Sequence, residues 1–190
     1  RPYVRFRDTL DTILPYLHSF ENLHLAIVAG NDEDYARHLR SECAELGLGN
    51  VTVFDYVERM AALMAASDLV ICKSGGLTVT ECLCARVPMI LLGKAYGQEN
   101  INVRTLTANG AAMHATTARE LLDTLRHVSR YPQSTDAMLI NGSFLRRPDA
   151  ARDIAHAAMR LAGKPPESDD PIRRKHFLHF YWGRKPAHIR

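Results

Sequence analysis

The chain has 190 residues, of which 46% are hydrophobic and 24% are charged, enough to bury the core of one domain. No apolar stretch approaches the roughly 20 residues that span a bilayer, and no signal peptide is expected. The 24 basic and 21 acidic residues give a formal net charge of +3. Six of the basic residues follow Asp170 and leave the rest of the chain with 18 against 21, a net charge of −3. This acidic body argues against a general nucleic-acid-binding domain.

Short apolar runs alternate with helical patterns along the chain. In chain order, the expected elements are a helix over 8–20 capped by Asp8, a strand over 23–29, a helix over 32–46, a strand over 51–54, a helix over 58–66, a strand over 69–72, a helix over 78–85, a strand over 88–92, a helix over 99–108, a strand over 111–115, a helix over 118–129 and an amphipathic helix over 149–161.

This alternation predicts an α/β fold. Apolar strands with two buried faces form parallel sheets that helices cover on both sides, so we expect a Rossmann-like domain over residues 1–163. A break at Gly163-Lys164-Pro165-Pro166 separates it from a basic, aromatic tail over 164–190. In such sheets ligands bind beyond the carboxyl ends of the strands.

A glycine pair, Ser74-Gly75-Gly76, leaves the third expected strand and opens a helix. Glycines let a ligand approach the backbone, and a helix N-terminus offers free N–H groups and about half a positive charge. The turn therefore suits a phosphate or diphosphate, with the Thr78 hydroxyl as a further donor. A plain turn with Gly75 in a left-handed conformation explains the glycines equally well.

Polar side chains near two helix starts extend this pattern. Glu81 lies beyond the first turn of its helix, where a carboxylate suits the hydroxyls of a ribose or, alternatively, interacts with the helix dipole in solvent. Gln98 and Glu99 open the helix after the fourth strand and suit sugar hydroxyls, although Glu99 also fits an N-terminal capping acid. Asn102, one turn further, is placed to orient these groups.

These segments resemble a known family. The stretches SGGLTVTE (74–81) and GQENIN (97–102) are similar to motifs of glycosyltransferase family 28, in the C-terminal domain of GT-B enzymes that form lipid II or glycosylate diacylglycerol. The resemblance covers most of residues 8–130. It implies an inverting UDP-sugar hexosyltransferase with a lipid acceptor and no cofactor or catalytic metal.

The resemblance also implies a donor site. The Val57 backbone, beside Tyr56 and ahead of Met60, would read the uracil, and Glu81 would hold the ribose. Further donor-site residues carried over are Ser74, Gly75, Gly76, Leu77, Thr78, Gln98, Glu99 and Asn102. The helix N-terminus would stabilise the charge that grows on the leaving UDP.

Two departures from the family pattern limit the expected activity. The acceptor-binding domain, which carries the catalytic base in this family, is not matched, so no catalytic residue is assigned. The first strand of such domains and its glycine-rich loop are also not matched. We therefore expect this chain alone to bind nucleotide weakly and to transfer no sugar. The alternatives are a UDP-N-acetylglucosamine epimerase and a non-catalytic subunit that binds a nucleotide sugar.

Other segments carry weaker signals. Asp32-Glu33-Asp34 has the DxD spacing of a metal–diphosphate site, but acids at a helix start also favour the helix dipole, so no metal is expected. The tail is expected to cross back to the missing domain, to contact an anionic membrane surface, or to be disordered. Cys43, Cys72, Cys82 and Cys84 lack CxxC spacing and fit structural thiols in a reducing compartment. We expect a cytoplasmic protein, either free or peripheral on the inner membrane face.

Overall fold

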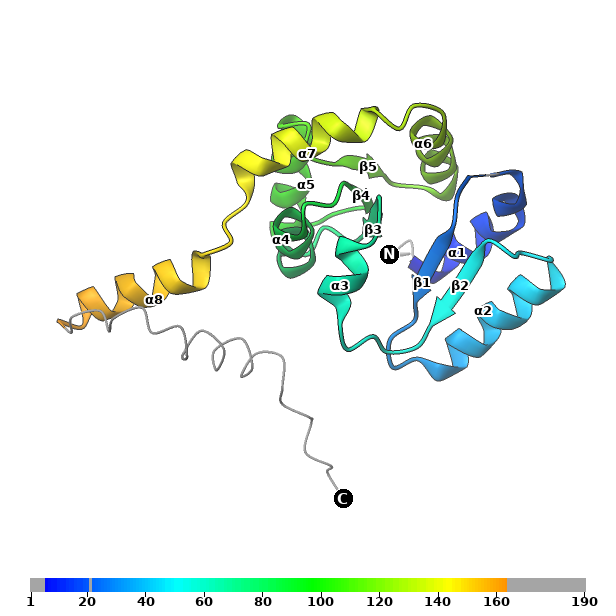
Figure 1. The fold of residues 1–190 in the computed structure, drawn as a ribbon, viewed down its shortest axis with the longest axis horizontal. Helices are drawn as coiled ribbons and strands as arrows, with labels where there is room; N and C mark the ends of the chain where they lie inside the picture. The colour runs from blue at the N-terminus through cyan, green and yellow to red at the C-terminus, as the bar shows by residue number, and fades with distance from the viewer. Residues whose placement is uncertain (1–5, 21, 164–190) are drawn as a thin grey trace, which may run out of the picture. The chain divides into compact units, whose positions relative to one another are not determined.

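The structure is a computed structural model that describes residues 6–20 and 22–163 (Figure 1). The chain divides into two compact units, Arg1–Arg147 and Pro148–Arg190. The first unit contains all the candidate site residues and is described first. The tail expected after residue 163 lies outside the described residues.

The first unit begins with a helix, α1 (Phe6–Ile13), that gives way to a 3-10 helix, η1 (Leu14–Ser19). The expected single helix over 8–20, capped by Asp8, is therefore wrong in detail. Pro15 lies in the first turn of η1 and cannot donate a backbone hydrogen bond, which accounts for the break. The next elements, β1 (Leu25–Val28), α2 (Glu33–Glu45) and β2 (Val51–Phe54), lie within the expected ranges.

The remaining elements of this unit are α3 (Met60–Ala65), β3 (Val70–Cys72), α4 (Gly76–Ala85), β4 (Met89–Leu92), α5 (Gln98–Ala108), β5 (Met113–Ala115), α6 (Ala118–Arg130) and α7 (Ser134–Leu145). All but α7 match expected elements. The sequence of α7 hides its helical pattern because its buried residues are Met138 and Gly142, while the larger Ile140 and Phe144 are exposed. Gly142 packs on α4, since an added Cβ would lie 3.1 Å from Leu83 Cδ2.

The strands are all parallel, as expected, but they form two sheets within the described chain. One sheet pairs β1 with β2, and the other has the order β3-β4-β5. In a doubly wound sheet with the strand order 3-2-1-4-5-6, the first strand lies between the second and the fourth. The two sheets fit this order if β1 and β2 are its second and third strands and β3, β4 and β5 are its fourth to sixth. One further parallel strand between β1 and β3 would then join the two sheets.

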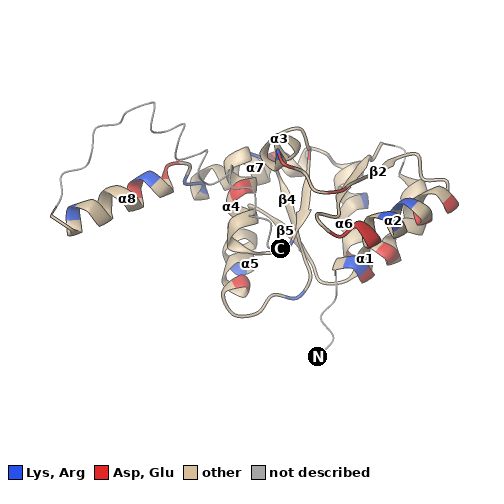
Figure 2. Ribbon diagram, turned by 90° about the horizontal axis from the view of Figure 1, so that it is seen from below, with Lys and Arg blue, Asp and Glu red and all other residues tan. Residues whose placement is uncertain are grey.

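Strand β4 separates two apolar cores. Ile90 and Leu92 pack into a core with residues of α1, η1, α2 and α6, whereas Met89 and Leu91 pack with residues of α3, α4 and α5. All four side chains are buried. Helices therefore cover both faces, and Figure 2 shows the charged residues on helices and loops rather than on the central strands. The α/β, Rossmann-like fold class is confirmed.

The described part of the second unit contains α8 (Ala150–Leu161). None of its residues is buried, and Ile154 and Leu161 are 69% and 91% exposed. Across the described ranges, we find no helix whose length and apolar character would let it cross a membrane.

The turn between α5 and β5 offers a test of the packing of α7. Gly110 has φ +64°, an added Cβ would lie 2.8 Å from Asn141 Nδ2, and that nitrogen donates to the Gly110 carbonyl at 3.3 Å. Gly47 has φ +65° with no atom within 4 Å of the added Cβ. Urea unfolding should show a loss of about 1–2 kcal/mol for Gly47→Ala and about 2–3 kcal/mol for Gly110→Ala, because the second variant also disturbs a hydrogen bond. Equal losses would contradict the described contact with α7.

Candidate functional site

The site lies where β3 and β4 end. Ser74 and Gly75 connect β3 to α4, and the loop 93–97 connects β4 to α5. Figures 1 and 2 both show α4 and α5 side by side. The two motifs that the sequence analysis selected therefore meet at one edge of the sheet.

The N-terminus of α4 presents free backbone donors. Gly75 is the N-cap residue and provides no side chain to cap the helix, and the Val79 N–H donates to the Gly75 carbonyl at 3.1 Å. The N–H groups of Gly76, Leu77 and Thr78 precede that bond and have no carbonyl acceptor within the helix. Three amides that point out of a helix N-terminus form a suitable site for an anion.

Neither glycine of the pair has a positive φ. Gly75 has φ −65° and ψ 140°, an extended conformation that any residue adopts, so the alternative of a left-handed Gly75 is wrong. A Cβ at Gly75 would lie 4.0 Å from Glu99 Oε1, and one at Gly76 would lie 4.0 Å from Asn102 Nδ2. The start of α5 is thus the nearest neighbour of the turn, and an added Cβ at either glycine would still be at van der Waals distance from it.

Asn102 makes the hydrogen bond that joins the two segments. Its Nδ2 donates to the Ser74 carbonyl at 2.8 Å, and Ser74 itself is only 5% exposed. Sequence spacing alone could not reveal this bond, because it connects the loop after β3 with helix α5, two segments that the pairing of β3 with β4 brings together.

The remaining polar residues of the site are exposed or partly so. Glu81, Gln98 and Glu99 are exposed, and no described residue forms a side-chain hydrogen bond or ion pair with them. The N-cap of α5 is Gly97, so Glu99 lies in the first turn without capping the helix by hydrogen bond. Thr78 is half-buried. The carboxylates and the amide are free to bind hydroxyl groups.

The loop between β2 and α3 carries the expected base-binding segment. Val57 is half-buried and Tyr56 is 65% exposed. Helix α3 packs against α4, which brings this loop to the same side of the fold as the glycine turn. No hydrogen bond among the described residues joins Val57 to the turn itself.

Several apolar side chains on the segments that form the site are exposed. We call the following four residues the apolar rim: Tyr56, Leu77, Tyr96 and Ile101, which are 65%, 80%, 54% and 63% exposed. The sequence analysis did not select Tyr96 or Ile101. Tyr96 precedes Gly97 and Ile101 lies near the start of α5, and these positions next to the motif could have pointed to both residues. Exposed apolar groups that cluster beside a cleft or motif often mark an interaction surface.

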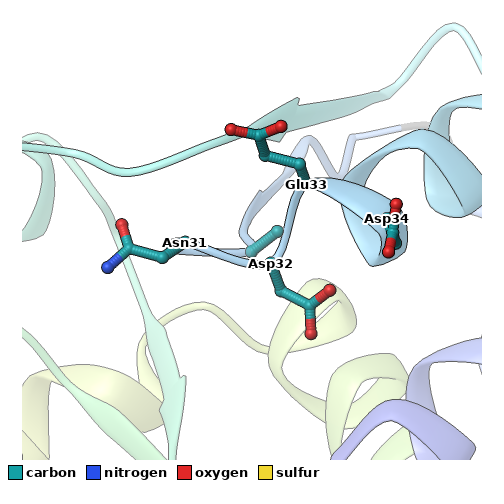
Figure 3. Close-up of a pocket in the computed structure, with 5 residues that line it drawn as sticks. Asn31, Asp32, Glu33 and Asp34 are labelled. Carbon is teal, nitrogen blue, oxygen red and sulfur yellow. The ribbon is translucent and has the colours of Figure 1, made fainter. Parts of the chain in front are cut away.

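The DxD segment lines a different hollow, of about 510 Å³, together with Ala29 and Asn31 (Figure 3). Asp32 caps α2 by accepting the Tyr35 N–H at 3.1 Å and pairs with Arg7, while Asp34 pairs with Arg37. Figure 3 shows the Asp32 and Glu33 carboxylates pointing to opposite sides. The helix-start interpretation is confirmed, and three carboxylates make this hollow unfavourable for a diphosphate.

Two buried thiols lie next to the site. Cys72 ends β3 and Cys82 lies on α4, and both are free and buried. A hydrogen bond with Cys82, together with burial, raises the pKa of the Cys72 thiol above its ordinary value. Cys72 therefore stays protonated at neutral pH and packs in the core rather than acting as a nucleophile.

A second hollow, of about 570 Å³, lies between β5 and α6 and is lined by His114, Glu120 and His127 among others. Glu120 accepts the Thr116 N–H at 2.6 Å and the Thr116 hydroxyl at 2.8 Å, and these bonds lower its pKa. His114 Nε2 is 2.8 Å from the Gly93 carbonyl oxygen. These polar groups are used to hold the start of α6 and the end of β4.

Comparisons with known proteins agree with this geometry. The model of the glycosyltransferase family 28 C-terminal domain matches residues 6–146. A UDP-N-acetylglucosamine–N-acetylmuramyl-(pentapeptide) pyrophosphoryl-undecaprenol N-acetylglucosamine transferase of Azotobacter vinelandii is 32% identical over 58% of this chain and 33% of its own length. A processive diacylglycerol beta-glucosyltransferase of Staphylococcus carnosus is 30% identical over 56% of this chain and 27% of its own length.

Among solved structures, Acinetobacter baumannii MurG superposes with a TM-score of 0.64 at 22% identity, covering 80% of this chain and 46% of that one. This likeness shows the fold alone. The chain thus spans about a third of the length of the curated relatives it matches and just under half of the solved structure.

Proposed function

Because the chain belongs to the glycosyltransferase family 28 C-terminal domain family, we propose that it is the UDP-sugar-binding half of an inverting hexosyltransferase. One observation carries this proposal. Helix α4 presents three free amides behind a glycine turn that lies next to the start of α5, and an unpaired carboxylate, Glu81, follows on the next turn.

Each part of the donor has a matching group. The N–H groups of Gly76, Leu77 and Thr78 bind the diphosphate, with the Thr78 hydroxyl as a further donor. Glu81 accepts hydrogen bonds from the ribose hydroxyls, and the Val57 backbone reads the uracil. Gln98 and Glu99, exposed at the start of α5, bind the hydroxyls of the hexose.

The same groups explain how the reaction is assisted. As the bond between the hexose and the diphosphate breaks, negative charge grows on the leaving UDP, next to the free amides of α4. Fixed donors that already point at this position stabilise the charge without rearranging, and no metal is needed for that purpose. The catalytic base belongs to a part of the enzyme outside this chain, so this chain alone transfers no sugar.

The acceptor side is proposed from the apolar rim and from the relatives. Both curated relatives are named for lipid-linked acceptors. The residues of the apolar rim are exposed on the segments that form the donor site, and exposed apolar side chains suit contact with the acceptor-binding half of a GT-B enzyme. We propose a lipid acceptor at the inner membrane face, where the basic residues after Asp170 add attraction to anionic lipid. The alternatives of an epimerase or a non-catalytic subunit are favoured by no residue of the described ranges.

Calorimetry with UDP, GDP and ADP tests the nucleotide assignment. UDP should bind most tightly, because the Val57 segment reads the pyrimidine edge while the amides of α4 serve any diphosphate. Equal binding of the three nucleotides would contradict a uridine site, and no binding at millimolar concentrations would contradict a nucleotide site altogether.

Removing metal should leave binding unchanged. In the described ranges, no three His, Cys, Asp or Glu side chains are grouped so that they could hold a metal ion. We therefore expect the same affinity for UDP in EDTA and in Mn²⁺, measured by calorimetry at constant ionic strength. A strong dependence on Mn²⁺ that disappears in Asp32→Asn would restore the metal interpretation of the DxD segment.

A further inference from the structure

The contact between α5 and the glycine turn does more than pack two helices. The Asn102 amide bonds the Ser74 carbonyl at 2.8 Å, and both groups are at least partly shielded from water. Asn102 lies one turn inside α5, behind Gln98 and Glu99, so it does not project from the helix start as they do.

The carbonyl that Asn102 holds belongs to the same planar unit as the Gly75 N–H. Because a trans peptide keeps its C=O and N–H pointing in opposite directions, fixing the Ser74 oxygen also fixes the direction of the Gly75 N–H. Gly75 is the N-cap of α4, and the three free amides follow it. The orientation of this peptide therefore sets the direction in which the chain enters α4.

The two glycines leave the backbone conformation of this turn weakly restrained. Neither Gly75 nor Gly76 has a side chain to restrict the backbone, and a glycine loses more conformational freedom on ordering than any other residue. Added Cβ atoms would lie 4.0 Å from Glu99 Oε1 and Asn102 Nδ2, so α5 is the nearest neighbour but leaves room around the turn. The hydrogen bond from Asn102 to the Ser74 carbonyl is therefore the contact that restrains it.

We infer that Asn102 is a positioning residue that couples the two halves of the donor site. It holds the diphosphate-binding turn against the helix that carries Gln98 and Glu99, so the spacing between diphosphate and hexose sites is set before the donor arrives. Binding then needs less ordering of the turn. This inference rests on the proposed function, but it concerns a contact to backbone instead of a contact to the ligand.

Affinities for UDP and uridine, measured by calorimetry, distinguish this role from a general effect on folding. Asn102→Ala should lower the affinity for UDP about tenfold, the effect of losing one well-made hydrogen bond, and should change the affinity for uridine much less, because uridine makes no use of the turn. Asn100→Ala is the matched control. Asn100 is an exposed amide two residues away on α5 whose side chain bonds no described residue, so its variant should bind both ligands as the unsubstituted chain does.

The outcomes separate the two proposals. If the unsubstituted chain binds no UDP, the proposed function fails and this inference fails with it. If the chain binds UDP and Asn102→Ala binds it equally well, or loses UDP and uridine affinity in equal proportion, only the inference is overturned. Asn102→Leu keeps the side-chain volume without the donor and should reproduce the selective loss. If thermal melts show that both variants are unfolded, Asn102 is needed for the fold itself and the positioning role is rejected.

Discussion

Gly76→Asp should weaken UDP binding about 100-fold while leaving the fold intact. The added Cβ has room, since its nearest described atom would be Asn102 Nδ2 at 4.0 Å. An aspartate at the first residue of α4 is favourable for the helix, because acids near an N-terminus interact well with the helix dipole. The same carboxylate would lie about 5 Å from a bound diphosphate, where like charges repel by about 3 kcal/mol at an effective dielectric constant of about 20.

Gly76→Asn provides the matched control because it has nearly the same shape without the charge. Calorimetry should show a much smaller loss of UDP affinity for Gly76→Asn, and uridine should bind alike to both variants. Similar losses for the two variants would indicate a steric effect, and unchanged UDP binding by Gly76→Asp would place the diphosphate elsewhere.

Glu81→Gln should lower the affinity for UDP by about 10- to 100-fold. A carboxylate that accepts hydrogen bonds from neutral hydroxyls contributes about 1.5–3 kcal/mol, and an amide offers a weaker, uncharged acceptor. Glu81 is exposed and bonds to no other described side chain, so the substitution should change the free energy of unfolding little.

The ribose assignment can be separated from a general charge effect with 2′-deoxy-UDP. This ligand lacks one of the two hydroxyls, so Glu81→Gln should weaken its binding less than it weakens the binding of UDP. Glu45→Gln, at an exposed position near the C-terminal end of α2, should change neither affinity. Equal losses for the two nucleotides in Glu81→Gln would refute the contact with the ribose.

The sequence predicts the strands well where burial is continuous. Met89–Leu92 is an uninterrupted apolar run between Pro88 and Gly93, and all four side chains are buried on two faces. Helix α7 could not be recognised in this way, because Gly142 supplies part of its buried face and Phe144 is 73% exposed. Its packing depends on a close approach to Leu83 that no local pattern reveals.

The division into two sheets also could not be predicted from local sequence patterns. Apolar strands predict a parallel sheet, but they do not say which strands are neighbours, and β1 and β3 each have a single partner among the described strands. In a doubly wound order, a further parallel strand would separate β1 from β3.

The site shows the same distinction between local and long-range information. The glycine turn and the start of α4 follow from ten consecutive residues. The bond from Asn102 to Ser74 joins residues 28 positions apart and depends on the pairing of β3 with β4. Chemistry carried by one segment was visible in the sequence, whereas the geometry between segments was not.

A crystal structure of this chain with UDP tests the central claim most directly. The account predicts the diphosphate within hydrogen-bond distance of the Gly76, Leu77 and Thr78 N–H groups, with the Glu81 carboxylate on the ribose hydroxyls. A nucleotide bound in the hollow beside Asp32, or a ribose that leaves Glu81 facing solvent, would contradict it.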